Sequence, residues 1–178
     1  MIKKILTTAA LLMGFSAMAT ENVDTTTAEH LDIYVAALIG VSSVSNQVNS
    51  GPGYGLQAAY YFANPFGAGL FLQGGSHEKG VTSFLVGGQA LYNLQVLLQG
   101  LQVGALLGLE KFSAGGITGS QSLAYGGKVA YDYRISAQYP ISLGIDVSYL
   151  LTTKADNIRK TSNNFAILTP LATAKIWF

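Results

Sequence analysis

The sequence has 178 residues, enough for one domain, and only 11 % of them are charged. Hydrophobic residues make up 49 %, the formal net charge is +1 and cysteine is absent, so disulfides, thiolate chemistry and strong nucleic-acid binding are excluded. Because a typical soluble protein carries about 25 % charged residues, this composition favours a membrane protein.

The chain begins with the three parts of a secretory signal peptide in order. Lys3 and Lys4 form a basic region, Ile5–Phe15 an apolar region, and Ala17–Ala19 an A-x-A cleavage site. We expect residues 1–19 to be cleaved, residues 20–30 to be a periplasmic tether, and residues 31–178 to be the folded domain. Without the signal peptide, eight basic and nine acidic side chains leave a net charge near −1.

Beyond the signal peptide no stretch of 18 or more apolar residues occurs, which excludes transmembrane helices. An exported chain of this kind enters lipid only as a closed sheet, in which every backbone group is paired. Alternation with a period of two predicts eight strands, of which the fifth is the least defined because residues 94–100 fit a strand start, a turn or a helix-like segment. In chain order the strands are about Asp32–Ser42, Tyr54–Phe62, Phe66–Gln73, Phe84–Asn93, Leu101–Glu110, Leu123–Ser136, Ile141–Leu151 and Ala166–Phe178.

Charged side chains within these strands lie on the Gly/Ser/Gln face and not on the Leu/Val/Ile face. A soluble barrel would need a densely charged exterior, and this face is too sparsely charged for that role. The polar face is therefore predicted to line the interior and the apolar face to meet lipid, as in an all-β, eight-stranded antiparallel up-and-down transmembrane barrel. The interior would then hold an ionic network of Asp32, Glu110, Lys128, Asp132, Arg134, Asp146 and Lys175.

The connections and the aromatic residues predict an orientation. Tight turns are expected at Asn64–Pro65, near Asn93 and at 137–140, and longer loops at 43–52, 76–81, 112–121 and 153–163. Outer-membrane barrels keep short turns in the periplasm and longer loops outside, so both termini are expected in the periplasm. Two aromatic girdles are expected: Phe62, Phe66, Tyr92, Tyr133, Tyr139 and Phe178 at the periplasmic ends, and Tyr54, Phe84, Tyr125, Tyr149 and Phe165 at the outer ends.

With a signal peptide, eight alternating strands and a terminal Phe178, the chain resembles the small outer-membrane barrels, a group that includes the OmpA membrane domain and the OmpX/Ail-type and OmpW-type proteins. The resemblance is architectural and covers nearly all of residues 31–178. Its one local motif is the last strand, where Phe178 and Ile176 resemble the signal read by the barrel-assembly machinery. The resemblance implies residence in the bacterial outer membrane, among its lipids and lipopolysaccharide, as a monomer.

The function expected first is structural, because side chains fill an eight-stranded barrel. A narrow pore for ions or small solutes stays open as an alternative, as does adhesion through the loops. The basic loop residues Lys154, Arg159 and Lys160 would contact a host surface or lipopolysaccharide phosphates.

We expect no enzymatic activity, cofactor or metal. His77 stands between Ser76 and Glu78 in an expected outer loop, but consecutive residues rarely form a catalytic triad. His30 precedes the first strand, beside the expected tether.

Overall fold

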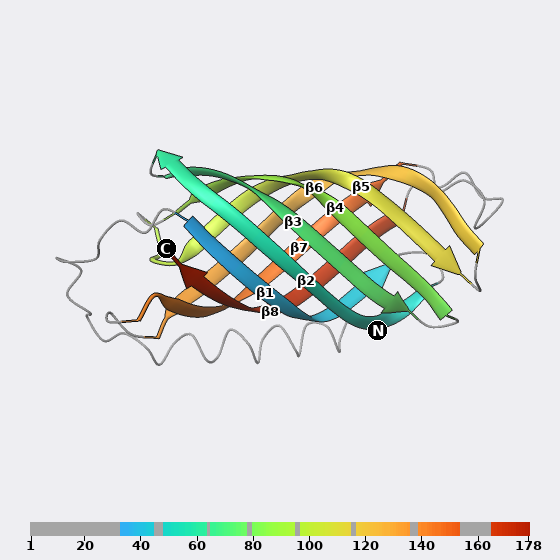
Figure 1. Ribbon diagram of the computed structural model, residues 1–178, viewed down its shortest axis with the longest axis horizontal. Helices are drawn as coiled ribbons and strands as arrows, with labels where there is room; N and C mark the ends of the chain where they lie inside the picture. Colours follow the sequence, from blue (N-terminus) through green and yellow to red (C-terminus); the bar gives the residue numbers. More distant parts are fainter. Residues whose placement is uncertain are drawn as a thin grey trace.

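The chain forms a closed antiparallel β-barrel. The computed structural model describes residues 33–44, 48–63, 65–77, 80–94, 97–114, 117–135, 139–153 and 165–178. Each strand pairs with the next, and the last pairs with the first, which confirms the predicted eight-stranded up-and-down architecture (Figure 1). The strands are β1 (Ile33–Val44), β2 (Val48–Ala63), β3 (Phe66–His77), β4 (Val81–Asn93), β5 (Leu101–Ala114), β6 (Ile117–Arg134), β7 (Ile141–Thr152) and β8 (Phe165–Trp177).

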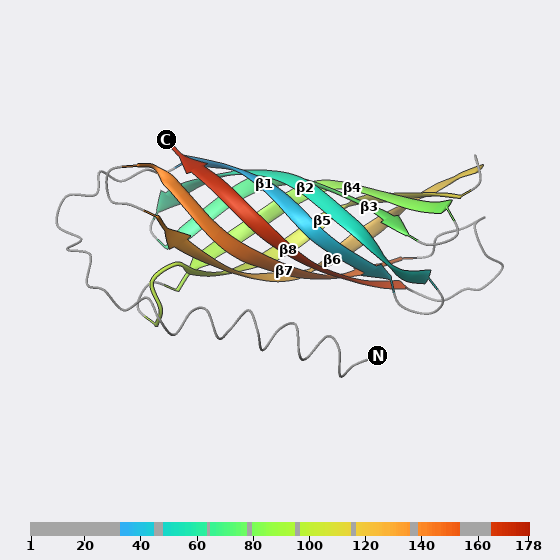
Figure 2. The ribbon, with the colours of Figure 1, turned by 90° about the horizontal axis from the view of Figure 1, so that it is seen from below.

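The two open ends of the barrel serve as reference points. β8 ends and β1 begins at one end, here named the C-terminal rim, and the other end is the opposite rim (Figure 2). Among the described residues no helix is long and apolar enough to cross a membrane. The expected signal peptide and tether, residues 1–30, lie outside the described residues.

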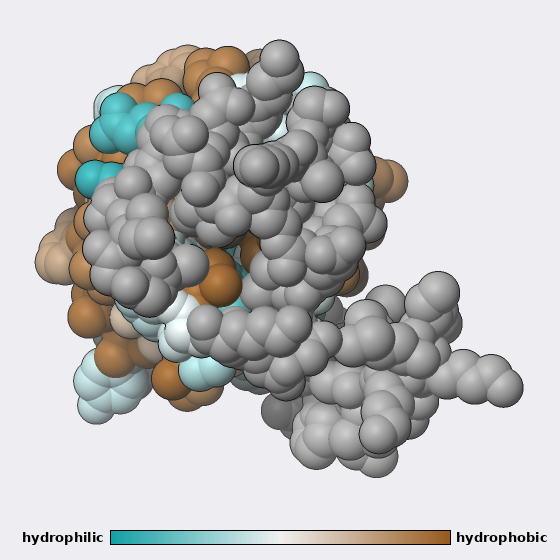
Figure 3. Space-filling model, turned by 90° about the vertical axis from the view of Figure 1, so that its right-hand side faces the viewer, coloured by the Kyte–Doolittle hydropathy of each residue, from teal (hydrophilic) through white to brown (hydrophobic). Residues whose placement is uncertain are grey.

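Side chains alternate between the outer wall and the interior, as the period of two predicts. In β1 the burial pattern is strictly alternating from Ile33 to Ile39, with Ile39 71 % exposed and Tyr34 fully buried. Leu70 in β3 is 70 % exposed in the same way. Hydrophobic residues cover much of the visible outer wall in the end-on view, with hydrophilic residues in places between them (Figure 3). Because this apolar surface encircles the barrel, it is stable only where hydrocarbon covers it.

Exposed aromatic residues recur eight positions apart on three strands. The pairs are Tyr54 with Phe62, Phe84 with Tyr92, and Tyr125 with Tyr133. Eight residues of strand, tilted by about 40°, span roughly 20 Å along the barrel axis, close to the height of an outer-membrane apolar band. The paired rings therefore form two girdles at the expected ends. The side chain of Phe165 lies outside the described residues.

The predicted loop lengths are wrong at the opposite rim. Strands continue past the girdle that contains Tyr54, Phe84 and Tyr125, here named the far girdle. Three of the expected loops are therefore shorter, with connections at 45–47, 78–80 and 115–116, and only the connection at 153–164 is long. The β5–β6 hairpin reaches farthest (Figure 1). Past this girdle the outward positions are polar, as at Thr82, Lys111 and Gln121, while inward residues such as Phe112 stay buried, so these segments lack the apolar alternation that marked the strands in the sequence.

At the C-terminal rim the connection after Asn93 is longer than the tight turn that was expected there. The β4–β5 connection spans 94–100, where the amides of Leu97 and Leu98 both donate to the Leu94 carbonyl in a helix-like turn. Gly100 ends this turn with φ +86°, and its carbonyl accepts the Asp132 amide at 2.9 Å. A helix-like segment was one of the interpretations open for these residues.

Two exposed cations change the expected division of charge between the faces. The extension of β5 adds Lys111, which is exposed on the outer wall opposite Phe84. Arg134, expected in the interior, is exposed at the end of β6 because the strand there reaches the C-terminal rim. Both lie near strand ends, and no charged side chain described in the middle of the apolar band is exposed.

Candidate functional site in the barrel interior

The interior next to the C-terminal rim is closed by three aromatic rings. The ring centroids of Tyr34 and Trp177 are 5.1 Å apart, and those of Tyr61 and Trp177 are 6.2 Å apart. Trp177 Nε1 donates a hydrogen bond to Ser142 Oγ of the neighbouring strand β7 at 3.0 Å, which fixes the orientation of the indole. These rings come from β1, β2 and β8, which the closure of the barrel brings together.

Two buried ion pairs lie deeper in the interior. Lys128 Nζ is 2.7 Å from Asp146 Oδ2, and Lys175 Nζ is 2.5 Å from Asp132 Oδ2. All four side chains are at least nine-tenths buried. Such pairs are tolerated only when further hydrogen bonds satisfy the charged groups.

Two buried glutamines supply those hydrogen bonds. Gln57 accepts from Lys128 Nζ at 2.8 Å and donates to Asp146 Oδ2 at 3.1 Å. Gln102 likewise accepts from Lys175 at 3.3 Å and donates to Asp132 at 3.0 Å. Each cation, carboxylate and amide thus forms a closed triangle. Both glutamines belong to the polar face of their strands, but the sequence gives no sign that they join the ionic network, because they lie 71 and 73 positions from the lysines that they bind.

A glycine makes room for the pair that joins β6 and β8. Gly144 of β7 stands in register between Asp132 and Thr173, so the strand that separates the pair carries no side chain there. A Cβ at Gly144 would meet the backbone and carboxylate of Asp132. Lys175 Nζ also lies 4.4 Å from the centroid of the Tyr34 ring, a cation–π contact that links the ion pairs to the aromatic cluster.

The structure brings together four of the seven residues expected in the ionic network: Lys128, Asp132, Asp146 and Lys175. Glu110 is buried but takes part in neither pair, and Arg134 is excluded by its exposure. Asp32 lies outside the described residues, as do the basic loop residues Lys154, Arg159 and Lys160.

The last strand places its terminal residues on the outer wall. Phe178 is 63 % and Ile176 49 % exposed. The Phe178 amide donates to the Ile33 carbonyl at 2.9 Å, so the terminal residue completes the seam between β8 and β1. The two residues expected as an assembly signal therefore lie at the closing strand with their side chains outward.

Apolar side chains enter the interior beyond the ion pairs, toward the opposite rim. They form a buried cluster of Val44, Phe71, Leu85, Leu106, Phe112, Ala124, Leu150 and Ile167. Together with the aromatic cluster it encloses the two ion pairs from both sides.

His77 does not lie in a loop, as the sequence suggested, but is the last residue of β3 and is buried. Its Nε2 lies 3.1 Å from Ser83 Oγ, and not beside Ser76, whose side chain is exposed. A serine next to a histidine imidazole resembles a hydrolytic dyad, but both side chains are less than a tenth exposed and offer no surface to a substrate. No group of three or more His, Asp or Glu side chains in the described part of the chain is arranged to hold a metal ion.

The fold is similar to that of several solved structures. Neisserial surface protein A is 17 % identical with a TM-score of 0.65, the match covering 82 % of this chain and 97 % of that one. The outer-membrane protein Ail of Yersinia pestis in a phospholipid bilayer nanodisc is 16 % identical with a TM-score of 0.51, covering 82 % and 99 %. The outer-membrane protein OprG of Pseudomonas aeruginosa is 13 % identical with a TM-score of 0.50, covering 83 % and 96 %.

These similarities confirm the expected resemblance to the small outer-membrane barrels at the level of the fold. No family model matches the sequence, and no curated protein matches it either.

Proposed function

We propose that this protein is an integral protein of the bacterial outer membrane whose filled barrel contributes to the integrity of that membrane. The observation that carries the proposal is the combination of an apolar outer wall between two aromatic girdles with an interior closed by paired charges and packed rings. The wall matches a hydrocarbon layer, and the interior leaves no wide path for solutes. A pore is the weaker alternative for this reason.

The C-terminal rim is proposed to face the periplasm and the opposite rim the outside. An up-and-down barrel with an even number of strands keeps both ends of the chain on one side, and the long 153–164 connection lies at the opposite rim. Outer-membrane lipids and lipopolysaccharide are then the partners of the outer wall. The barrel-assembly machinery is the proposed partner of the strand that ends at Ile176 and Phe178.

Deletion of the gene in its host tests the structural role. We expect the deletion strain to take up more of an apolar fluorescent probe, and a plasmid copy to restore the barrier. A plasmid copy of the uncharged double variant Lys128→Met/Asp146→Asn should restore it equally, because the proposed role needs the folded barrel and not the interior charges. An unchanged barrier in the deletion strain would contradict the role, and restoration by wild type alone would point to a function of the charges themselves.

Location and orientation need a separate measurement. Fractionated outer membranes should contain a form that migrates differently before and after boiling. A cysteine introduced at Thr118, near the tip of the β5–β6 hairpin, should react with an impermeant maleimide on intact cells, whereas a cysteine at Tyr139, in the turn at the C-terminal rim, should not. The reverse labelling pattern would contradict the orientation.

Binding of a surface or ligand at the opposite rim is a second candidate function. It is favoured by the continuation of β2, β5 and β6 beyond the far girdle, because these strand extensions project past the apolar band and are available for contact with a surface or ligand. Cell-binding assays with Lys154, Arg159 and Lys160 replaced by glutamine test it. Unchanged binding would show that the basic residues of the 153–164 connection are not the binding site.

A further inference from the structure

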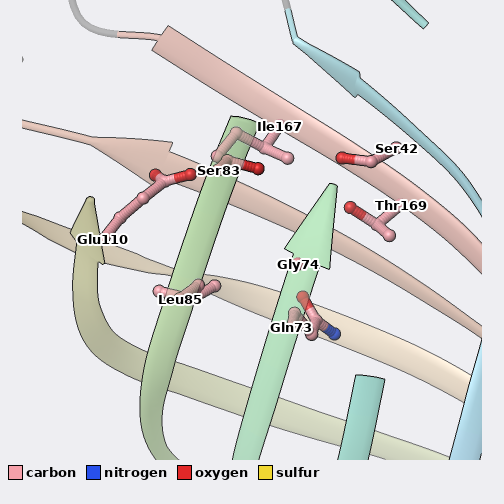
Figure 4. A pocket seen from close by; sticks show the side chains of 8 residues that line it. All are labelled: Ser42, Gln73, Gly74, Ser83, Leu85, Glu110, Ile167 and Thr169. Atoms are coloured by element: carbon pink, nitrogen blue, oxygen red, sulfur yellow. The ribbon is translucent and has the colours of Figure 1, made fainter. Parts of the chain in front are cut away.

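A small polar gap lies in the barrel interior at the level of the far girdle. Figure 4 shows five polar side chains converging on it from five strands: Glu110 of β5, Ser83 of β4, Gln73 of β3, Ser42 of β1 and Thr169 of β8. Each of the five is more than nine-tenths buried. The gap is about the size of one water molecule.

Glu110 brings a carboxyl group to this gap without a counter-charge in the described structure. It is 1 % exposed, and its Oε2 has no hydrogen-bond partner among the described residues. The two lysines of the interior are already committed to Asp146 and Asp132. A carboxylate buried without a compensating positive charge is strongly unfavourable, so either a cation or a proton must accompany Glu110.

The atoms around the gap suit a small hard cation. Hard cations take oxygen ligands, and the side chains offer a carboxylate, three hydroxyl groups and an amide oxygen. Only one of these ligands is charged, which matches a single positive charge, and the gap is too small for a hydrated or large ion. Backbone hydrogen bonds between neighbouring strands fix the positions of the five strands, so the ligands are held in place before an ion binds.

The contact between His77 and Ser83 is compatible with such a site. When neutral His77 carries its proton on Nδ1, its Nε2 accepts the Ser83 hydroxyl hydrogen at 3.1 Å. The lone pairs of Ser83 Oγ are then free for a cation. His77 is an ionisable residue hydrogen-bonded to Ser83, which lines the gap. A proton on His77 is therefore the source of positive charge that competes with a bound cation.

We propose that the gap beside Glu110 binds a sodium ion or another monovalent cation of similar size. The ion neutralises Glu110 and ties β1, β3, β4, β5 and β8 together at the far girdle. Leu85 and Ile167, which belong to the apolar cluster, complete the lining of the gap.

Refolding experiments test the site with the full chain. The urea-unfolded protein is refolded into detergent micelles at mildly alkaline pH in sodium, potassium or N-methylglucamine chloride of equal ionic strength, and its unfolding is followed by the fluorescence of Trp177. Sodium at ten times its dissociation constant should shift the unfolding equilibrium about 11-fold toward the folded barrel. N-methylglucamine should give no shift, and potassium a smaller one than sodium. Equal stability in sodium and N-methylglucamine would overturn the proposal.

Variants assign the effect to the gap. Glu110→Gln keeps the shape of the side chain and removes its charge, so it should abolish the sodium dependence. Thr169→Val removes one ligand and should raise the sodium concentration needed for half the effect. Arg134→Gln, at an exposed position, is the control that should keep the wild-type response. A sodium dependence retained in Glu110→Gln would overturn the site, and a sodium dependence that is absent from the wild-type chain but appears in His77→Gln would assign the positive charge to His77 instead.

Discussion

Removal of one partner from the Lys128–Asp146 pair should destabilise the barrel strongly. Lys128→Met keeps the length and apolar stem of the side chain but leaves Asp146, which is fully buried, with only the Gln57 amide 3.1 Å from its carboxylate. Breaking a buried pair on one side costs about 3–5 kcal/mol, a large part of the roughly 5–15 kcal/mol that stabilises a typical domain. Asp146→Asn should fall at the lower end of that range, because its amide oxygen still accepts from the lysine.

The double variant Lys128→Met/Asp146→Asn should recover most of this loss. The introduced asparagine amide can both donate to and accept from Gln57, so no charge or amide is left without a partner. We expect its free energy of unfolding to lie within about 2 kcal/mol of wild type, since an uncharged replacement of a buried pair is often neutral.

Urea unfolding from detergent micelles measures all three variants. Trp177, the only tryptophan of the chain, packs 5.1 Å from the Tyr34 ring and reports on the closed interior. Arg134→Gln is the matched control and should change stability by no more than about 0.5 kcal/mol, because the side chain is exposed. A double variant whose loss equals the sum of the two single losses would refute the reasoning that the two charges compensate one another.

Three further outcomes follow from the interior and the turns. Trp177→Phe should lower the free energy of unfolding by about 1 kcal/mol through the lost hydrogen bond to Ser142, measured as the urea midpoint of the band shift on unboiled gels. Gly100→Ala should cost about 1 kcal/mol or more in the same assay, because φ at this position is +86° and a Cβ would meet the backbone of Asp132; an unchanged midpoint would argue against the turn. In planar bilayers the wild-type barrel should show no steady conductance, and a steady open channel would contradict the filled interior.

The barrel wall was predictable because its signal is local. In β1 and β7 successive side chains face hydrocarbon and the interior in turn. Apolar and polar residues alternate accordingly, so the sequence indicates both where a strand lies and which of its residues face the lipid. Where the wall rises beyond the apolar band, the outward residues no longer face hydrocarbon and are polar, so the apolar alternation is lost. The extensions of β2, β5 and β6, and with them the exposed Lys111, could not be predicted for this reason.

The pairing inside the barrel was decided by the tertiary structure. The sequence showed that charged and amide side chains share the inner face, but not which of them meet. Gln57 and Lys128, 71 residues apart, come into contact only because eight strands close in one register. Arg134 takes no part in the buried ion pairs because it lies at the end of its strand, where its side chain is exposed. Alternation along a strand is a property of neighbouring residues, whereas contact across a closed barrel depends on the number and stagger of all the strands.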